Sequence, residues 1–252
     1  MIARGNARLL LDTHYVLKPE QLDLILIAGN LNLFIEEGDL KNHIARIHHT
    51  EDYGLIKISN SIAEEGQKRF VIAHEIGHFI NERKKNIHGC TAADLIGYKS
   101  KKELEREANI FAAELLMRDE WVKDFTRGRI PGVKLIKDCA EYFRTSLTSA
   151  AIRYAETGRH PTAVILSKDK KVVWSAINKD FKFKWVPAGY AVNGNSYAFE
   201  YFTEGIMDTD INEVLADSWF LEDKFYRRNY KLFEQNIYLT NYKSVLTILW
   251  EK

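Results

Sequence analysis

The chain has 252 residues, of which 46% are hydrophobic and 28% are charged, which is enough apolar material for one large domain or a few small ones. A formal net charge of +1 excludes a strong overall attraction to nucleic acid or to a membrane surface. The chain has only two cysteines, which argues against a disulfide scaffold. It has no run of about 18 apolar residues, which argues against a membrane span, and no apolar core near its N-terminus, which argues against a signal peptide. We therefore expect a soluble, cytoplasmic protein.

The first sixty residues are predicted to form a helix followed by three short strands. Residues 19–29 begin with proline, carry spaced apolar side chains and end at Gly-Asn, which is typical of a helix. Residues 31–37, 43–48 and 55–59 form short apolar or alternating runs, which indicate strands. If the third of these strands lies at a sheet edge, an extended peptide could bind beside it as an additional strand.

Residues 64–82 are predicted to form a buried helix that contains the sequence His-Glu-Ile-Gly-His. His74 and His78 are four positions apart, so on a helix they share one face and both imidazoles can bind a single metal ion. Glu75 points elsewhere on the same turn, toward a water on that metal. This spacing is the H-E-x-x-H pattern of zinc peptidases, and it predicts a zinc site with Glu75 as the catalytic base.

A catalytic zinc site usually has three protein ligands, and the helix predicted at residues 101–117 offers several glutamates for the third. Glu103, Glu107 and Glu114 share one face, and spacing alone does not choose among them. Glu107 lies mid-helix beside the apolar seam, where a partly buried carboxylate is costly unless a metal binds it. Glu103 and Glu105 are expected on a solvated face. The seam is expected to comprise Leu104, Ala108, Phe111 and Leu115.

The chain changes in character after these two helices. Residues 128–132 contain two glycines and a proline, which is typical of a linker. Residues 133–143 and 148–156 are predicted to form two short helices joined by a tight turn, similar to a helix-turn-helix. The segment 123–160 has an excess of four positive charges, which makes a DNA contact conceivable, but this charge is modest for a nucleic-acid-binding surface and a helical scaffold between two domains is the favoured explanation.

The last part of the chain is predicted to be rich in β-structure, with its aromatic side chains in a core or around a ligand pocket. The whole chain is thus expected to be α+β, with a metallopeptidase domain at residues 1–128, a helical linker at 129–160 and a β-rich domain at 161–252. The predicted strands of that last domain are residues 163–167, 172–177, 181–185, 196–202 and 245–250.

The chain resembles the ImmA/IrrE family of metallopeptidases in two places. One is the metal motif, and the other is residues 105–117, which read Glu-Arg-Glu-Ala-Asn-Ile-Phe-Ala-Ala-Glu-Leu-Leu-Met. The resemblance implies a zincin-like fold over residues 7 to about 118, followed by the helical segment. It also implies that the glutamate before Ala-Asn, which is Glu107 here, is the third zinc ligand. The family usually has proline after the methionine, whereas this chain has Arg118, a departure expected to affect only the end of the helix.

The resemblance also implies a function. Family members inactivate repressors of mobile elements or of damage responses, so we expect a zinc endopeptidase that cuts a helix-turn-helix repressor. The alternative is a non-proteolytic zinc-containing regulator that binds a repressor or DNA. Such a regulator would not need Glu75 as a general base. Some members carry GAF-like C-terminal domains, which suggests a sensor in residues 161–252. A further hypothesis is that the Cys90 thiolate occupies the open position of the zinc.

Overall fold

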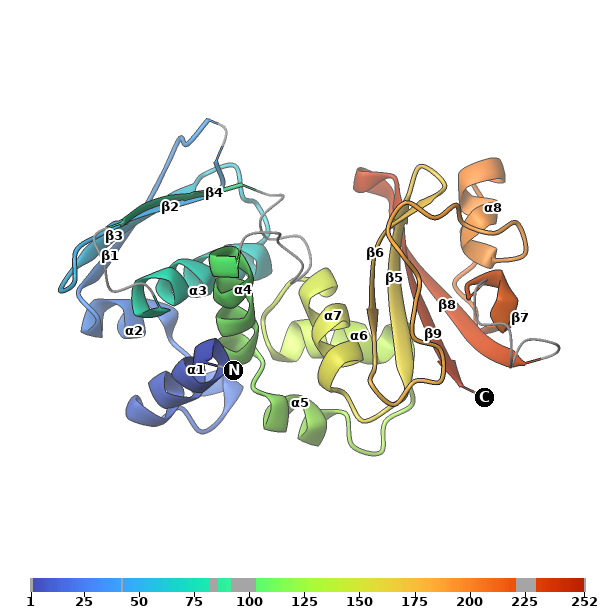
Figure 1. The fold of residues 1–252 in the computed structure, drawn as a ribbon, viewed down its shortest axis with the longest axis horizontal. Coiled ribbons are helices and arrows are strands. Elements are labelled where there is room, and N and C mark those ends of the chain that lie inside the picture. Colours follow the sequence, from blue (N-terminus) through green and yellow to red (C-terminus); the bar gives the residue numbers. More distant parts are fainter. Residues whose placement is uncertain (1, 42, 82–85, 92–102, 221–229, 252) are drawn as a thin grey trace. The chain divides into compact units, whose positions relative to one another are not determined.

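The protein is described by a computed structural model that covers residues 2–41, 43–81, 86–91, 103–220 and 230–251 (Figure 1). The chain forms two compact units. The first comprises Met1–Trp121 and Ala140–Ser149, and the second comprises Val122–Cys139 and Ala150–Lys252. The predicted helical linker at residues 129–160 is therefore divided between the two units. No helix in the described ranges is long and apolar enough to cross a membrane.

The first unit contains a four-stranded sheet in the order β1–β3–β2–β4. Strand β1 (Leu33–Gly38) is parallel to β3 (Gly54–Ser59), and β2 (Ala45–His49) is antiparallel to both β3 and β4 (Asn86–Cys90). Buried and exposed residues alternate along β2, so one face of the sheet lies on the core. The three predicted strands are confirmed. Because β3 is paired on both sides, it is not the edge strand that peptide addition would require.

Helices α3 (Glu65–Asn81) and α4 (Glu103–Leu116) form the core of the first unit and confirm the two helices predicted around the metal motif. Helix α3 packs on β2 and β3 with one side and on α4 with another, so it is buried over most of its length. This double contact explains why even polar side chains of α3, including those of the metal motif, are buried.

Two further helices belong to this unit. The predicted helix at 19–29 is a 3₁₀ turn, Pro19–Gln21, followed by α2 (Leu24–Asn30), and the Asp23 carboxylate accepts from the first backbone N–H groups of α2. Helix α1 (Ile2–Thr13) was not predicted, although its buried residues have helical spacing. It packs on both α3 and α4. These buried residues are Ala3, Ala7, Leu10 and Leu11.

The helical segment contains α5 (Asp119–Phe125), α6 (Val133–Tyr142) and α7 (Leu147–Thr157). Helices α6 and α7 are those predicted from the sequence, and Arg144 in their connection has a positive φ of 52°. Within α7 only Glu156 is exposed. A helix that reads DNA must present side chains to a groove, so the burial of α7 gives no support to a DNA contact through it.

The second unit contains a five-stranded sheet in the order β6–β5–β9–β8–β7, in which every neighbouring pair is antiparallel. A β-rich C-terminal region is thereby confirmed, while its likeness to GAF domains stays a prediction. Short 3₁₀ turns occur at Ala216–Ser218 and Thr240–Tyr242. The strands are β5 (Thr162–Lys168), β6 (Lys171–Ile177), β7 (Asn212–Leu215), β8 (Lys231–Leu239) and β9 (Ser244–Glu251).

Two predicted strands of this unit are wrong. Residues 196–202 lie mostly in helix α8 (Tyr197–Glu204), which begins after Ser196 and ends at Gly205 with a positive φ of 72°. Residues 181–185 are irregular, yet Phe181 and Phe183 are fully buried in the hydrophobic core. Aromatic density suggested strands at both places, but here it reflects burial against the sheet rather than strand structure.

Candidate metal centre

His74 and His78 meet at one point on the inner face of α3. Both are buried, with exposed fractions of 0% and 1%, and their Nε2 atoms are 3.0 Å apart. The helix produces this meeting because residues four positions apart stack one turn above the other. The sequence therefore identified both histidines, and the structure brings them together as predicted.

Glu105 in the first turn of α4 completes the group. Its Oε2 atom lies 3.2 Å from Nε2 of His74 and 3.5 Å from Nε2 of His78. The residue is only 5% exposed. Within the described ranges, these three side chains form the one group of three or more potential ligands whose donor atoms converge.

The other glutamates of α4 lie elsewhere. Glu107, which the sequence favoured as third ligand, is of intermediate burial and lies outside the convergent group. The side chain of Glu103 is 83% exposed, and Glu114 is fully buried but pairs with Arg8 at 2.6 Å. The expectation that Glu105 lies on a solvated face is wrong.

Leu104 explains this difference. The sequence placed it on the core face of α4, but it is 50% exposed. The other three residues of the expected seam are buried, as are Glu105 and Asn109, so the buried surface of α4 is wider than the expected seam and includes this polar pair. Glu105 and Asn109 are four positions apart and lie on one side of α4, as His74 and His78 do on α3. The signal available in the sequence was this second i, i+4 polar pair, opposite the histidine pair.

Asn109 fixes the orientation of His74. Its Oδ1 atom accepts from Nδ1–H of His74 at 2.9 Å, because an amide oxygen cannot donate. Burial lowers the pKa of His74, with the neighbouring Glu105 carboxylate opposing the shift, so the ring is neutral. In that tautomer the Nε2 lone pair points toward Glu105 and His78, which is the state a metal ligand requires.

Electrostatics at Glu105 agree with a cation at this point. Burial acts to raise the pKa of Glu105, but its interactions with His74 and His78 outweigh burial and hold the pKa well below its ordinary value. That lowering depends on protons donated to the carboxylate by the histidine Nε2 atoms, but the tautomer set by Asn109 leaves Nε2 of His74 with a lone pair, 3.2 Å from Oε2 of Glu105. Two such electron-rich atoms repel each other unless a positive charge lies between them.

The donor set fits a zinc ion. Bonds near 2.0–2.2 Å at tetrahedral angles place ligand atoms about 3.3 Å apart. The three separations here, 3.0, 3.2 and 3.5 Å, surround that value. Two imidazole nitrogens and one carboxylate oxygen are also the ligand types of zinc peptidases, and they leave a fourth position open.

Glu75 and Gly77 complete the motif on α3. Glu75 is 0% exposed. Burying a carboxylate costs free energy, so this position is not that of an ordinary solubilising surface residue. A Cβ atom on Gly77 would lie 3.0 Å from Phe111 of α4, so glycine permits the close approach of the two helices. The side chain of Cys90 lies outside the described residues.

Comparisons with known proteins show which family and which fold the chain resembles. Residues 28–154, just over half of the chain, match the peptidase M78 family, described as the IrrE N-terminal-like domain. The chain therefore belongs to this family. A solved structure of a Mycobacterium tuberculosis transcriptional regulator is similar in fold, with a TM-score of 0.55 and 14% sequence identity over 98% of this chain and 75% of that chain. A comparison with curated proteins finds no match.

Proposed function

We propose that this member of the IrrE N-terminal-like domain family is a zinc-dependent endopeptidase. The observation that carries the proposal is the convergence of His74, His78 and Glu105, with all three ligand atoms buried and His74 held by Asn109. Membership in a peptidase family supports the same conclusion. Glu105 takes the place of Glu107 as the proposed third ligand because its carboxylate, and not that of Glu107, lies beside both histidines.

The residues divide the catalytic work between them. When bound, zinc would supply Lewis acidity toward a peptide carbonyl and toward water. His74, His78 and Glu105, which are all buried, would hold it. Glu75 acts as general base: its carboxylate takes the proton of the attacking water and passes it to the departing amine. A purely structural zinc site has no such base and usually has four protein ligands.

The proposed substrate is a helix-turn-helix transcriptional repressor, cut once so that its genes are expressed. This step rests on the resemblance to family members that inactivate repressors, and it is in keeping with the printed description of the similar solved structure as a transcriptional regulator. An extended loop or linker is the expected target, because exposed flexible backbone is where proteolytic cleavage concentrates.

The test is cleavage of candidate repressors by the zinc-loaded protein and by Glu75→Gln. We expect one cut, identified by mass spectrometry, that is lost with chelator and reduced about a hundredfold to ten-thousandfold in Glu75→Gln while zinc is retained. Glu65→Gln is the matched control, because Glu65 lies on the same helix with its side chain 65% exposed. Full biological activity in Glu75→Gln would instead favour the non-proteolytic regulator.

A further inference from the structure

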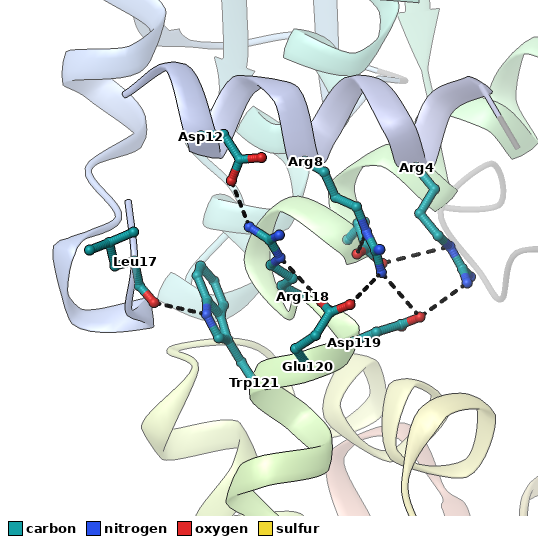
Figure 2. A network of polar contacts seen from close by, with 9 residues as sticks. Arg4, Arg8, Asp12, Leu17, Arg118, Asp119, Glu120 and Trp121 are labelled. Carbon is teal, nitrogen blue, oxygen red and sulfur yellow. Dashed lines mark hydrogen bonds and ion pairs between the residues drawn. The ribbon is translucent and has the colours of Figure 1, made fainter. Parts of the chain in front are cut away.

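Helix α1 is joined to the end of α4 and the start of α5 by a network of charged side chains (Figure 2). Arg4, Arg8 and Asp12 are spaced by four residues, so they lie along one face of α1. Figure 2 shows these three side chains directed toward the residues that follow α4. Helix α1 lies before residue 28, where the family match begins. The contacts of this helix are therefore features of this chain that the family match does not describe.

The centre of the network is a buried ion pair. Nε of Arg8 donates to Oε1 of Glu114 at 2.6 Å, and Nε of Arg4 lies 3.6 Å from the other carboxylate oxygen. The Glu114 side chain is 0% exposed, whereas those of Arg8 and Arg4 are 33% and 41% exposed. A carboxylate buried to this degree depends on its cationic partners, so the position of Glu114 is tied to that of α1.

The outer contacts fix the direction of α1. The guanidinium groups of Arg4 and Arg8 also approach Asp119 at 3.3 and 3.5 Å. At the other end, Nη1 of Arg118 donates to Asp12 at 2.8 Å. Turning α1 end for end would bring Asp12 onto the acidic residues, so the charge pattern specifies one orientation. Arg118, directly after the end of α4, is therefore part of this pattern.

The same helix carries the metal ligand. Glu105 and Glu114 are nine positions apart on α4, which is about half a turn more than two full turns, so they project from opposite sides. One side meets α3 through Glu105 and Asn109, and the other meets α1 through Glu114. Helix α4 is thus held between α3 and α1. A metal bond tolerates only about 0.2 Å of displacement, so the placement of α4 decides whether Glu105 reaches the metal.

We propose that Arg8 is a positioning residue for the metal site: by pairing with the buried Glu114 it holds α4 in the register that places Glu105 between His74 and His78. The inference rests on the metal site of the proposed function. Helix α1 would then be part of the catalytic unit rather than an appendage to it.

The test is zinc affinity of the full-length protein, measured by competition with a chromophoric chelator, together with the absorption spectrum of the cobalt-substituted protein. Arg8→Gln should weaken zinc binding at least about tenfold, within the range seen for residues that support metal ligands, and should change the cobalt spectrum. Arg8→Lys should recover part of the affinity, because an ammonium group can still pair with Glu114. Arg4→Gln should have a smaller effect, since its contact with Glu114 is longer.

Two further variants make the result decisive. Lys231→Gln is the matched control, because it removes a 2.8 Å ion pair with Glu213 in the second unit and should leave zinc affinity unchanged. The double variant Arg8→Met, Glu114→Gln removes both charges, so no unpaired carboxylate is left buried. If Arg8→Gln does not fold, the zinc affinity of this double variant tests the positioning role instead. If neither folds, Arg4→Gln and Arg8→Lys decide.

The outcomes separate the two proposals. If the folded variants bind zinc like the unmodified protein and show its cobalt spectrum, Arg8 only stabilises the fold and the inference is overturned. If the unmodified protein itself binds no stoichiometric metal, the proposed function fails instead. The positioning role is supported if zinc binding is weakened in Arg8→Gln or in the double variant while Lys231→Gln is unaffected. It is also supported if Arg4→Gln and Arg8→Lys show graded weakening with the same control unaffected.

Discussion

Asn109 determines which nitrogen of His74 is available to a metal, through one contact of 2.9 Å between its amide oxygen and Nδ1. Without this acceptor the neutral ring is free to place its proton on Nε2, which blocks the ligand position. Residues in this role typically change metal affinity by about tenfold to a hundredfold when they are replaced. The amide of Asn109 is therefore as much part of the site as the three ligands.

We predict that Asn109→Ala weakens zinc binding about tenfold to a hundredfold while the protein stays folded. Chelator competition measures the affinity, and circular dichroism verifies the fold. Asn212→Ala is a suitable control, since it removes an amide contact of 2.8 Å to Asp208 in the second unit. Equal zinc affinity in Asn109→Ala and the unmodified protein would show that His74 keeps its tautomer by other means.

The two histidines and Glu105 differed in how readily their convergence could be predicted from the sequence. His74 and His78 are fixed by local helix geometry, which depends only on their spacing. Glu105 is defined by how α4 is rotated against α3, and this rotation follows from tertiary packing. Leu104 was expected on the core face in place of its neighbour Glu105, but Leu104 is 50% exposed and Glu105 is buried. Single exposed leucines are common on protein surfaces, so one apolar residue was too weak a guide.

At the level of elements, the approach of α3 to α4 depends on Gly77. An added Cβ would lie 3.0 Å from Cδ1 and 3.2 Å from Cβ of Phe111, which is itself fully buried. Neither helix has space to accept an extra methyl group without moving. The separation between the helices sets the distance from the histidines to Glu105.

Gly77→Ala should destabilise the protein by about 1–3 kcal/mol, as overpacking a core usually does, and should also weaken zinc binding. Chemical denaturation gives the free energy of unfolding. Gly5→Ala in α1 is the matched control: a Cβ there meets nothing within 4 Å, so the change should stabilise α1 by about 0.5–1 kcal/mol through helix propensity. A neutral or stabilising Gly77→Ala would contradict the close packing of α3 and α4.

In the second unit, Glu234 on β8 ties helix α8 and Trp219 to the sheet. Its Oε1 accepts from the backbone N–H of Ala198 at 3.0 Å, and its Oε2 accepts from the indole N–H of Trp219 at 2.8 Å. The residue is 0% exposed. Burial raises the pKa of Glu234 despite hydrogen bonds, including that from Asn236, which act to lower it.

This raised pKa predicts the sign of a pH effect. Between the unfolded value, 4.5, and the higher folded value, the folded chain holds a proton that the unfolded chain has lost. The contribution of Glu234 to stability is therefore largest at low pH and falls as pH rises through this window. The difference in unfolding free energy between the unmodified protein and Glu234→Gln should decrease as pH rises from 4.5 through the raised pKa of Glu234. A difference that increases with pH would contradict the raised pKa.

At the scale of the whole molecule, the chain passes between the two units more than once. Residues 122–139 belong to the second unit, and Ala140–Ser149 belong to the first unit again. A Cβ on Gly66 of α3 would collide with the backbone of Thr145 and Ser146, so the α6–α7 connection packs directly on α3. The sequence revealed helices at 133–143 and 148–156 from local periodicity. It did not reveal that their connection belongs to the first unit, because this depends on contacts between residues far apart in the chain.

Two strands of the second unit, β7 and β8, were not predicted, and for β8 the reason is physical. Strand β8 (Lys231–Leu239) carries buried polar residues, Glu234 and Asn236, which broke the apolar pattern expected of a core strand. Their polar groups are satisfied internally, as in the 2.7 Å hydrogen bond from Thr247 to Asn236. Periodicity detects apolar faces and misses a buried polar network of this kind.

The central claim is that one metal ion is held by His74, His78 and Glu105, and its most direct test is the metal content of the purified full-length protein and two variants. Elemental analysis should find about one zinc per chain in the unmodified protein and in Glu107→Gln, and almost none in Glu105→Gln. The two variants make the same chemical change two positions apart on α4, so a difference between them isolates the ligand. Full zinc in Glu105→Gln together with loss of zinc in Glu107→Gln would contradict the account.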